Sequence, residues 1–184
     1  MDLCLVGSEM CIRDRLSGWD GESDFLDPMC GSGTILIEAA MYATNYPVNI
    51  KRHSFLFKNW KDFDLDLFEM IKASVLNKIK PFKFKINGYD KAPSAILKCK
   101  QNIINSGFES TISVSENNFF SSIKNNDNFL HILFNPPYGE RLKIDIQSFY
   151  KQIGDTLKTN YSNSNAWFIT CLLYTSDAAD DGTG

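Results

Sequence analysis

Short apolar segments alternate with segments of helical periodicity along residues 23–170, and this alternation is the feature that most restricts the fold. The apolar segments are too short for helices, and several end at an Asp or an Asn. The predicted strands are 24–26, 84–89, 111–115, 129–134 and 166–170, and the predicted helices are 34–42, 66–80, 94–106 and 146–159. Alternating strands and helices form parallel sheets covered on both faces, so we predict an α/β fold with a doubly wound, mostly parallel sheet.

One aromatic stretch, residues 51–64, interrupts the alternation. Four large rings occur in it without regular spacing: Phe55, Phe57, Trp60 and Phe63. The predicted helix that follows repeats apolar side chains at helical spacing. We therefore predict an insertion that packs on the sheet.

The two ends of the chain resemble translated sequencing adapter. Residues 5–15 resemble one reading of a transposon-based adapter, and residues 171–181 resemble its reverse complement. Two such matches at opposite ends and in opposite sense are improbable by chance. We expect residues 1–15 and 171–184 to be adapter-derived artefacts that do not contribute to the fold. Residues 16–170 are then a partial natural domain. The chain stops where a further helix and two closing strands are expected, so the sheet is predicted to be truncated at its C-terminal side.

Charge and cysteine content restrict the function classes. The net charge of -3 argues weakly against a polybasic nucleic-acid binder, although residues 72–100 carry eight Lys and one acidic residue. These Lys residues form either a surface that binds nucleic acid or an ordinary solvated surface. Between the adapter-like ends only Cys30 and Cys99 remain, so we expect no disulfide framework and no metal site. No apolar run is long enough to cross a membrane, and the expected location is the cytoplasm.

A glycine-containing turn follows the first predicted strand, with the sequence Asp27-Pro-Met-Cys-Gly-Ser-Gly-Thr34. Gly31 and Gly33 allow the backbone to approach a ligand, and the helix that begins near Thr34 directs unpaired N–H groups toward it. Such a loop suits a phosphate or a carboxylate. Position 36 is Leu and no Gly-Lys-Ser or Gly-Lys-Thr occurs, so two common nucleotide-binding patterns are absent. The loop is either a ligand site or a structural turn.

Polar residues also follow the second and third predicted strands. Asp90 has a carboxylate that can accept two hydrogen bonds from a ribose diol, or it is a helix N-cap or turn residue before Lys91-Ala92-Pro93. In Asn117-Asn118-Phe119 an amide can pair with an adenine edge while Phe119 flanks the ring. The alternative for these three residues is an ordinary polar loop.

The segment Asn135-Pro136-Pro137-Tyr138 follows the fourth predicted strand. Its two prolines fix φ and remove two donors, which holds the Pro136 carbonyl stiffly beside the Asn135 side-chain acceptor. Two neighbouring acceptors can hold both hydrogens of an –NH₂ group and direct the nitrogen lone pair at an electrophile. Tyr138 offers a face on which a base can stack. The alternative is a rigid turn.

Residues 27–40 and 135–142 closely resemble the methyltransferase domain of the THUMP-containing RNA methyltransferases. Within that family they are similar to the RlmL group, the bacterial 23S rRNA guanine-N2 methyltransferases. Residues 55–60 and 88–93 also resemble this group, and the resemblance covers most of residues 16–170.

The resemblance implies a Rossmann-like class I fold that binds S-adenosylmethionine (SAM). Asp90 would hold the ribose, and Asn118 stands where the family usually has an Asp that reads the adenine amine. The residues expected around the methionine part of the cofactor share one loop: Asp27, Cys30, Gly31 and Gly33.

The resemblance also implies the reaction. Asn135, Pro136 and Tyr138 would hold the N2 amine of a guanine in 23S rRNA for direct methyl transfer. The partner would be RNA, gripped with the help of a THUMP domain that precedes residue 16 and is missing here. Three alternatives remain open: adenine-N6 methylation of RNA or DNA, glutamine-N5 methylation of a protein, and a nucleotide-binding module without catalysis.

Overall fold

The computed structural model describes residues 17–48, 50, 52, 54–137 and 145–169. Its centre is a five-stranded sheet in the order β3-β2-β1-β4-β5. The strands are β1 (Asp24–Asp27), β2 (Ile86–Asp90), β3 (Ile112–Glu116), β4 (Leu130–Phe134) and β5 (Ser164–Phe168). All four neighbouring pairs are parallel, which confirms the predicted parallel sheet.

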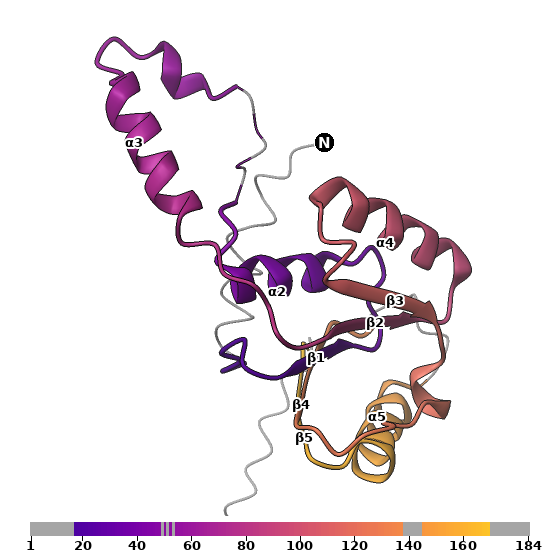
Figure 1. The fold of residues 1–184 in the computed structure, drawn as a ribbon. Coiled ribbons are helices and arrows are strands. Elements are labelled where there is room, and N and C mark those ends of the chain that lie inside the picture. The colour runs from indigo at the N-terminus through magenta and orange to yellow at the C-terminus, as the bar shows by residue number, and fades with distance from the viewer. Residues whose placement is uncertain (1–16, 49, 51, 53, 138–144, 170–184) are drawn as a thin grey trace, which may run out of the picture.

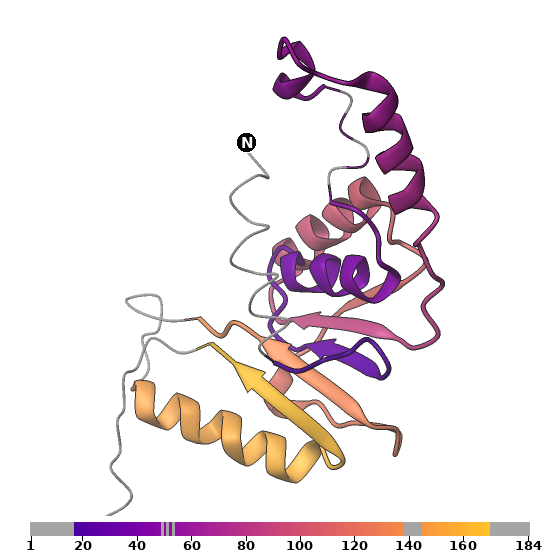
Figure 2. The same ribbon diagram turned by 90° about the vertical axis from the view of Figure 1, so that its left-hand side faces the viewer.

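Helices cover both faces of the sheet, as the alternation predicts. Helices α2 (Thr34–Thr44) and α4 (Pro93–Ser106) lie on one face and α5 (Ile146–Asn160) lies on the other (Figures 1 and 2). Neighbouring residues of β1 point to opposite faces, so Phe25 packs in the apolar layer under α2 and α4, whereas Leu26 packs in the layer under α5. In the described ranges, no helix is both long and apolar enough to span a bilayer.

The aromatic stretch, residues 54–64, does not pack on the sheet, so the predicted packing of this insertion is wrong. The short 3₁₀ helix η1 (Leu56–Asn59) and α3 (Leu65–Leu76) rise away from the sheet as a helical hairpin, residues 47–80 (Figures 1 and 2). Four of its rings, Phe55, Phe57, Phe63 and Phe68, pack against one another with centroids 5.1–6.1 Å apart. The aromatic side chains thus find apolar partners within the insertion itself, and no side chain of α3 is buried.

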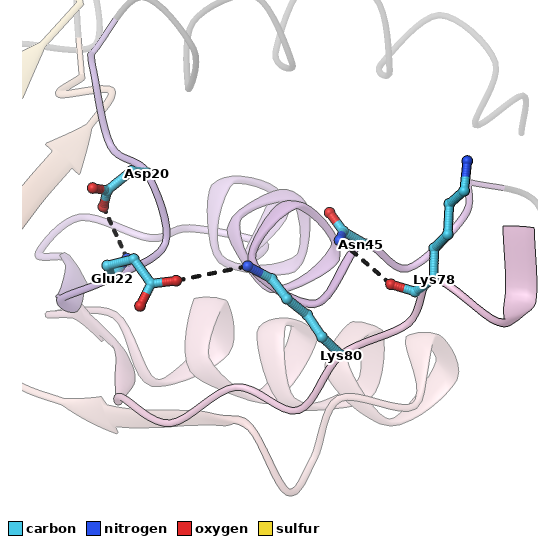
Figure 3. Close-up of polar contacts among 5 residues, drawn as sticks. All are labelled: Asp20, Glu22, Asn45, Lys78 and Lys80. Carbon is cyan, nitrogen blue, oxygen red and sulfur yellow. Dashed lines mark hydrogen bonds and ion pairs between the residues drawn. The ribbon is translucent and has the colours of Figure 1, made fainter.

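The hairpin is fixed at its root to the C-terminal end of α2 (Figure 3). The Lys80 N–H donates to the Thr44 carbonyl at 2.9 Å, and Asn45 Nδ2 donates to the Lys78 carbonyl at 3.4 Å. Lys80 Nζ lies 3.7 Å from a carboxylate oxygen of Glu22, in the turn before β1. Because α2 runs back across the sheet from the carboxyl end of β1, this root lies at the edge formed by the amino ends of the strands.

His131 of β4 is a buried titratable group in the layer under α2. It is 3% exposed, its Nε2 lies 3.0 Å from Ser17 Oγ, and its ring stacks on Phe25 with centroids 6.0 Å apart. Burial lowers the pKa of this imidazole from 6.5 to about 4, against a smaller opposing effect of Asp20. Between pH 6.5 and about 4, His131 is therefore neutral in the folded chain and protonated in the unfolded chain.

We predict that the free energy of unfolding falls as the pH is lowered from about 6.5, the pKa of an unfolded His, to about 4. In this pH range the unfolded state binds one proton that the folded state does not bind. The contribution of His131 to the free energy of unfolding is therefore fully present above pH 6.5 and falls by about 3 kcal/mol as the pH is lowered to about 4. Urea denaturation across this range measures it. His131→Gln should remove this component while leaving the carboxylate titrations common to both chains. An unchanged pH slope in the variant would contradict the assignment.

Candidate active site

The four polar segments predicted from the sequence come together at the edge formed by the carboxyl ends of the strands. The loop after β1 is central. The ends of β2 and β3 lie on one side of it and the end of β4 on the other, as the strand order requires. Open parallel sheets bind ligands at this edge, where the strand order reverses next to β1.

The loop after β1 is tied to the end of β2. Asp27 is 1% exposed, and its Oδ1 accepts a hydrogen bond from the Met29 N–H at 3.0 Å. The Cys30 N–H donates to the Tyr89 carbonyl at 2.8 Å, and the Gly31 N–H donates to Asp90 Oδ2 at 3.0 Å. Two successive N–H groups of the loop are therefore held by two successive residues of β2.

Asp90 organises three of the four segments. Its Oδ1 accepts from the Ala92 N–H at 2.8 Å, which is the turn role anticipated as the alternative to ribose binding. Its backbone carbonyl accepts from the Asn117 N–H at 3.1 Å, which joins the loop after β3. Each carboxylate oxygen has a second lone pair, so the turn role leaves acceptor capacity for a ligand.

The two glycines of the loop have different surroundings. Both have positive φ, +52° for Gly31 and +83° for Gly33, a region that other residues rarely adopt. A Cβ on Gly33 would lie 2.4 Å from Cys99 Sγ, whereas a Cβ on Gly31 would meet no atom within 4 Å. Gly33 thus lets the loop rest on α4, while Gly31 has open space beside it.

Two supporting residues of α4 were missed by sequence reasoning. Cys99 lies against Gly33, and Asn102 Nδ2 donates to the Ser32 carbonyl at 2.9 Å. They are three residues apart and therefore lie on the same face of α4. The only sequence signal was this spacing in the helix after Asp90, and that signal does not distinguish a loop support from an ordinary helix face.

The thiols of Cys30 and Cys99 are buried and form a hydrogen bond with each other. This bond, burial and the nearby Asp27 carboxylate raise the pKa of the Cys30 thiol. Because the thiolate is the nucleophilic form, a protonated Cys30 suits packing under the loop rather than covalent catalysis.

The residues after β3 have separate roles. Asn118 Oδ1 accepts from the Phe120 N–H at 3.2 Å and caps the short 3₁₀ helix η2 (Phe119–Ser121). Phe119 is 2% exposed in the apolar layer with Leu26 and Phe134, so the expectation that it flanks a ligand ring is wrong. The turn of η2 directs this ring into the layer beneath α5.

Asn135 follows β4, and its side-chain oxygen has no partner among the described residues. Its Oδ1 is buried, and within the described part of the chain no donor reaches it. An unsatisfied buried acceptor costs about 1–3 kcal/mol, so a donor from a ligand would relieve it. Pro136 is almost fully buried and fixes the chain at this point. Tyr138, predicted as the stacking residue, lies outside the described residues.

The fold and the carboxyl-edge site define an α/β protein of the methyltransferase type. The model of the family described as RMKL-like, methyltransferase domain, matches residues 14–179. The chain therefore belongs to this family.

The curated relatives point the same way. "Ribosomal RNA large subunit methyltransferase K/L" of Vibrio parahaemolyticus is 34% identical over 175 residues, which is 87% of this chain and 25% of the relative. The protein of the same name from Buchnera aphidicola is 34% identical over 160 residues, 80% of this chain and 22% of the relative. This chain thus spans about a quarter of the length of these relatives.

Solved structures share the fold. A possible methylase from Clostridium difficile superimposes with a TM-score of 0.76 at 33% identity, over 86% of this chain and 42% of that chain. The putative methyltransferase SMU.472, solved with S-adenosylhomocysteine (SAH), gives a TM-score of 0.78 at 26% identity, over the same two shares.

We predict that Gly33→Ala lowers the melting temperature more than Gly31→Ala does. Both changes strain a positive φ, but only the methyl group added at position 33 would also contact Cys99 Sγ. Thermal denaturation of the two variants measures the difference. Adding Cys99→Ala to Gly33→Ala should recover the part due to the contact. Equal losses for the two single variants would contradict the packing described.

Proposed function

We propose that this chain is the catalytic core of a SAM-dependent methyltransferase that modifies the N2 amine of a guanine in large-subunit ribosomal RNA. The observation that carries the proposal is the buried Oδ1 of Asn135 at the carboxyl end of β4, which no donor of the described residues reaches. Family membership supports methyl transfer as the reaction class.

The proposed cofactor site is the loop after β1 with its neighbours. When bound, SAM supplies a methyl group on a positively charged sulfur. The open side of Gly31 gives the cofactor room to approach the backbone, and the start of α2, which has no side-chain cap, offers N–H groups to its carboxylate. Asp90 would accept from the ribose hydroxyls with its remaining lone pairs. Asp27 and Cys30 would shape the loop around the methionine part.

Asn118 is proposed at the adenine edge. Its Oδ1 already caps η2 but keeps a second lone pair, and its amide –NH₂ can donate. The adenine contact here would thus use either the remaining lone pair for the adenine amine or the amide donor for a ring nitrogen.

The target amine is held from the other side of the loop. Asn135 Oδ1 and the Pro136 carbonyl accept its two hydrogens, which leaves the nitrogen lone pair directed at the methyl carbon. In this orientation the amine would accept the methyl group that bound SAM supplies and would release one proton to water. The chain contributes alignment and electrostatic stabilisation, and Tyr138 is proposed to stack on the base.

The choice of target rests on the relatives. Those named ribosomal RNA large subunit methyltransferase K/L support rRNA as the substrate, although this chain spans about a quarter of their length. A THUMP domain in the intact gene product would supply much of the RNA affinity. An adenine N6 or a glutamine N5 presents the same planar –NH₂, so these targets fit the acceptor pair too.

We predict that Asn135→Ala in the intact gene product lowers rRNA methylation at least 100-fold and leaves SAH affinity unchanged. A loss of this size is typical when one preorganised hydrogen bond to the reacting group is removed. Transfer of radioactive methyl to rRNA measures the rate, and calorimetry measures SAH binding. Asn128→Ala, in the loop before β4, is the matched control and should be fully active. Unchanged methylation by Asn135→Ala would refute the role of this side chain.

A strain that lacks the gene identifies the product. We predict that mass spectrometry of nucleosides from its 23S rRNA shows the loss of one N2-methylguanosine, restored by the wild-type gene but not by Asn135→Ala. Loss of N6-methyladenosine, or of methylglutamine in a protein, would replace the guanine target. No change in any methylated product would favour the non-catalytic alternative.

A further inference from the structure

The helical hairpin contains a groove between its two arms. The groove has a volume of about 330 Å³ and lies between the chain after α2 and one face of α3. A second hollow of about 360 Å³ adjoins it around η1 and shares Arg52, Phe55 and Lys58 with it. The groove is lined mainly by apolar side chains together with Arg52, Lys58 and Lys72, the second hollow has a mixed lining, and no described lining residue of either is acidic.

The cations of Arg52 and Lys58 are held over aromatic rings. The Arg52 guanidinium lies 5.4 Å from the ring centre of Phe55, and Lys58 Nζ lies 4.5 Å from that of Phe68. Arg52 Nε also donates to the Ser54 carbonyl at 2.9 Å. Neither cation forms an ion pair with a carboxylate in the described ranges. These contacts restrain both side chains, and no carboxylate of the described residues neutralises their charges.

The charge of the hairpin differs from that of the whole chain. Residues 50–80 carry seven Lys and Arg against four acidic residues, although the chain as a whole has a net charge of -3. The acidic residues are Asp62, Asp64, Asp66 and Glu69. Asp64 caps α3 by accepting from the Leu67 N–H, and Glu69 lies 3.8 Å from Lys72. The hairpin therefore has a net positive charge and can attract a polyanion to its groove.

An exposed aromatic ring stands beside the cations. Trp60 is 72% exposed at the end of η1, with Phe57 against it at a centroid distance of 6.3 Å. Lys58 and Lys61 flank it in the sequence. Exposed rings between cations are the arrangement that binds single-stranded nucleic acid, where phosphates meet the cations and bases stack on the rings.

We propose that the hairpin is a second RNA-binding surface, in which Arg52 and Lys58 contact phosphates and Trp60 stacks on an unpaired base. The inference rests on the proposed RNA substrate. The root of the hairpin lies at the C-terminal end of α2, whose eleven residues separate it by about 16 Å from the catalytic edge. The hairpin would therefore bind a part of the RNA that lies at a distance from the target base.

The test measures RNA affinity without catalysis. Fluorescence anisotropy with a labelled rRNA fragment, at several salt concentrations, is applied to the intact gene product and its variants. Arg52→Ala/Lys58→Ala should lower the affinity about tenfold or more and reduce the slope of log K against log salt by about 1.4, the value for two phosphates. Trp60→Ala should lower the affinity roughly fivefold or more with the slope unchanged, because stacking releases no counterions.

Lys151→Ala/Lys158→Ala on α5 removes the same charge from exposed positions elsewhere and should keep both affinity and slope. Unchanged SAH binding and circular dichroism show that each variant is folded. An intact gene product that binds RNA equally well with and without the Arg52 and Lys58 side chains overturns this inference alone. If the Arg52→Ala/Lys58→Ala variant keeps its RNA affinity but loses binding to a protein partner, the inference of RNA binding is overturned as well. If the unmodified gene product binds no RNA, the proposed function itself fails.

Discussion

The structure depends on the contact between the loop after β1 and the end of β2. Two N–H groups, of Cys30 and Gly31, are held by the Tyr89 carbonyl and the Asp90 carboxylate. Two parallel strands alone do not fix the path of the loop that follows them, but these two bonds do. The same carboxylate starts the turn into α4, and α4 in turn supports the loop through Cys99 and Asn102. Removing the Asp90 side chain would therefore disturb the loop and the turn into α4 together, whereas the Asn117 N–H would keep its bond to the Asp90 backbone carbonyl.

The two sides of this loop differ in how well their polar groups are satisfied. Toward β2 and β3, the side-chain oxygens of Asp90 and Asn118 accept backbone N–H groups, so any ligand there would use their remaining hydrogen-bonding capacity. Toward β4, Asn135 Oδ1 accepts nothing from the described residues although it is buried. A folded chain tolerates such a cost where the missing donor arrives with a ligand. The proposed division follows: one side binds the cofactor through a preformed frame, and the other side is completed by the substrate amine.

The fold could be predicted from the sequence because the strands are short and the first four predicted strands are each followed by a polar residue. The parallel sheet, its two helical layers and the meeting of Asp27, Asp90 and Asn135 at one edge all follow from alternation. Tertiary contacts decided the rest. The aromatic residues of the insertion were expected on the sheet, but apolarity does not specify a partner, and the rings of Phe57 and Phe68 pack within the hairpin instead. Phe119 was expected beside a ligand, and only the turn of η2 shows that it faces the core.

The self-packed hairpin also explains how an exposed apolar helix can persist. α3 buries no side chain, so it gains little from the sheet, yet its cap at Asp64 and its ring contacts through Phe68 hold it in place. The root contacts at Thr44 and Glu22 orient it. Exposed apolar and aromatic side chains on a positioned arm lower the stability of an isolated domain, and such patches are typical of interaction surfaces. The catalytic edge and this arm lie at opposite ends of α2. A macromolecular substrate long enough to reach both would bind more tightly than the target nucleotide alone, because the two contacts act within one complex.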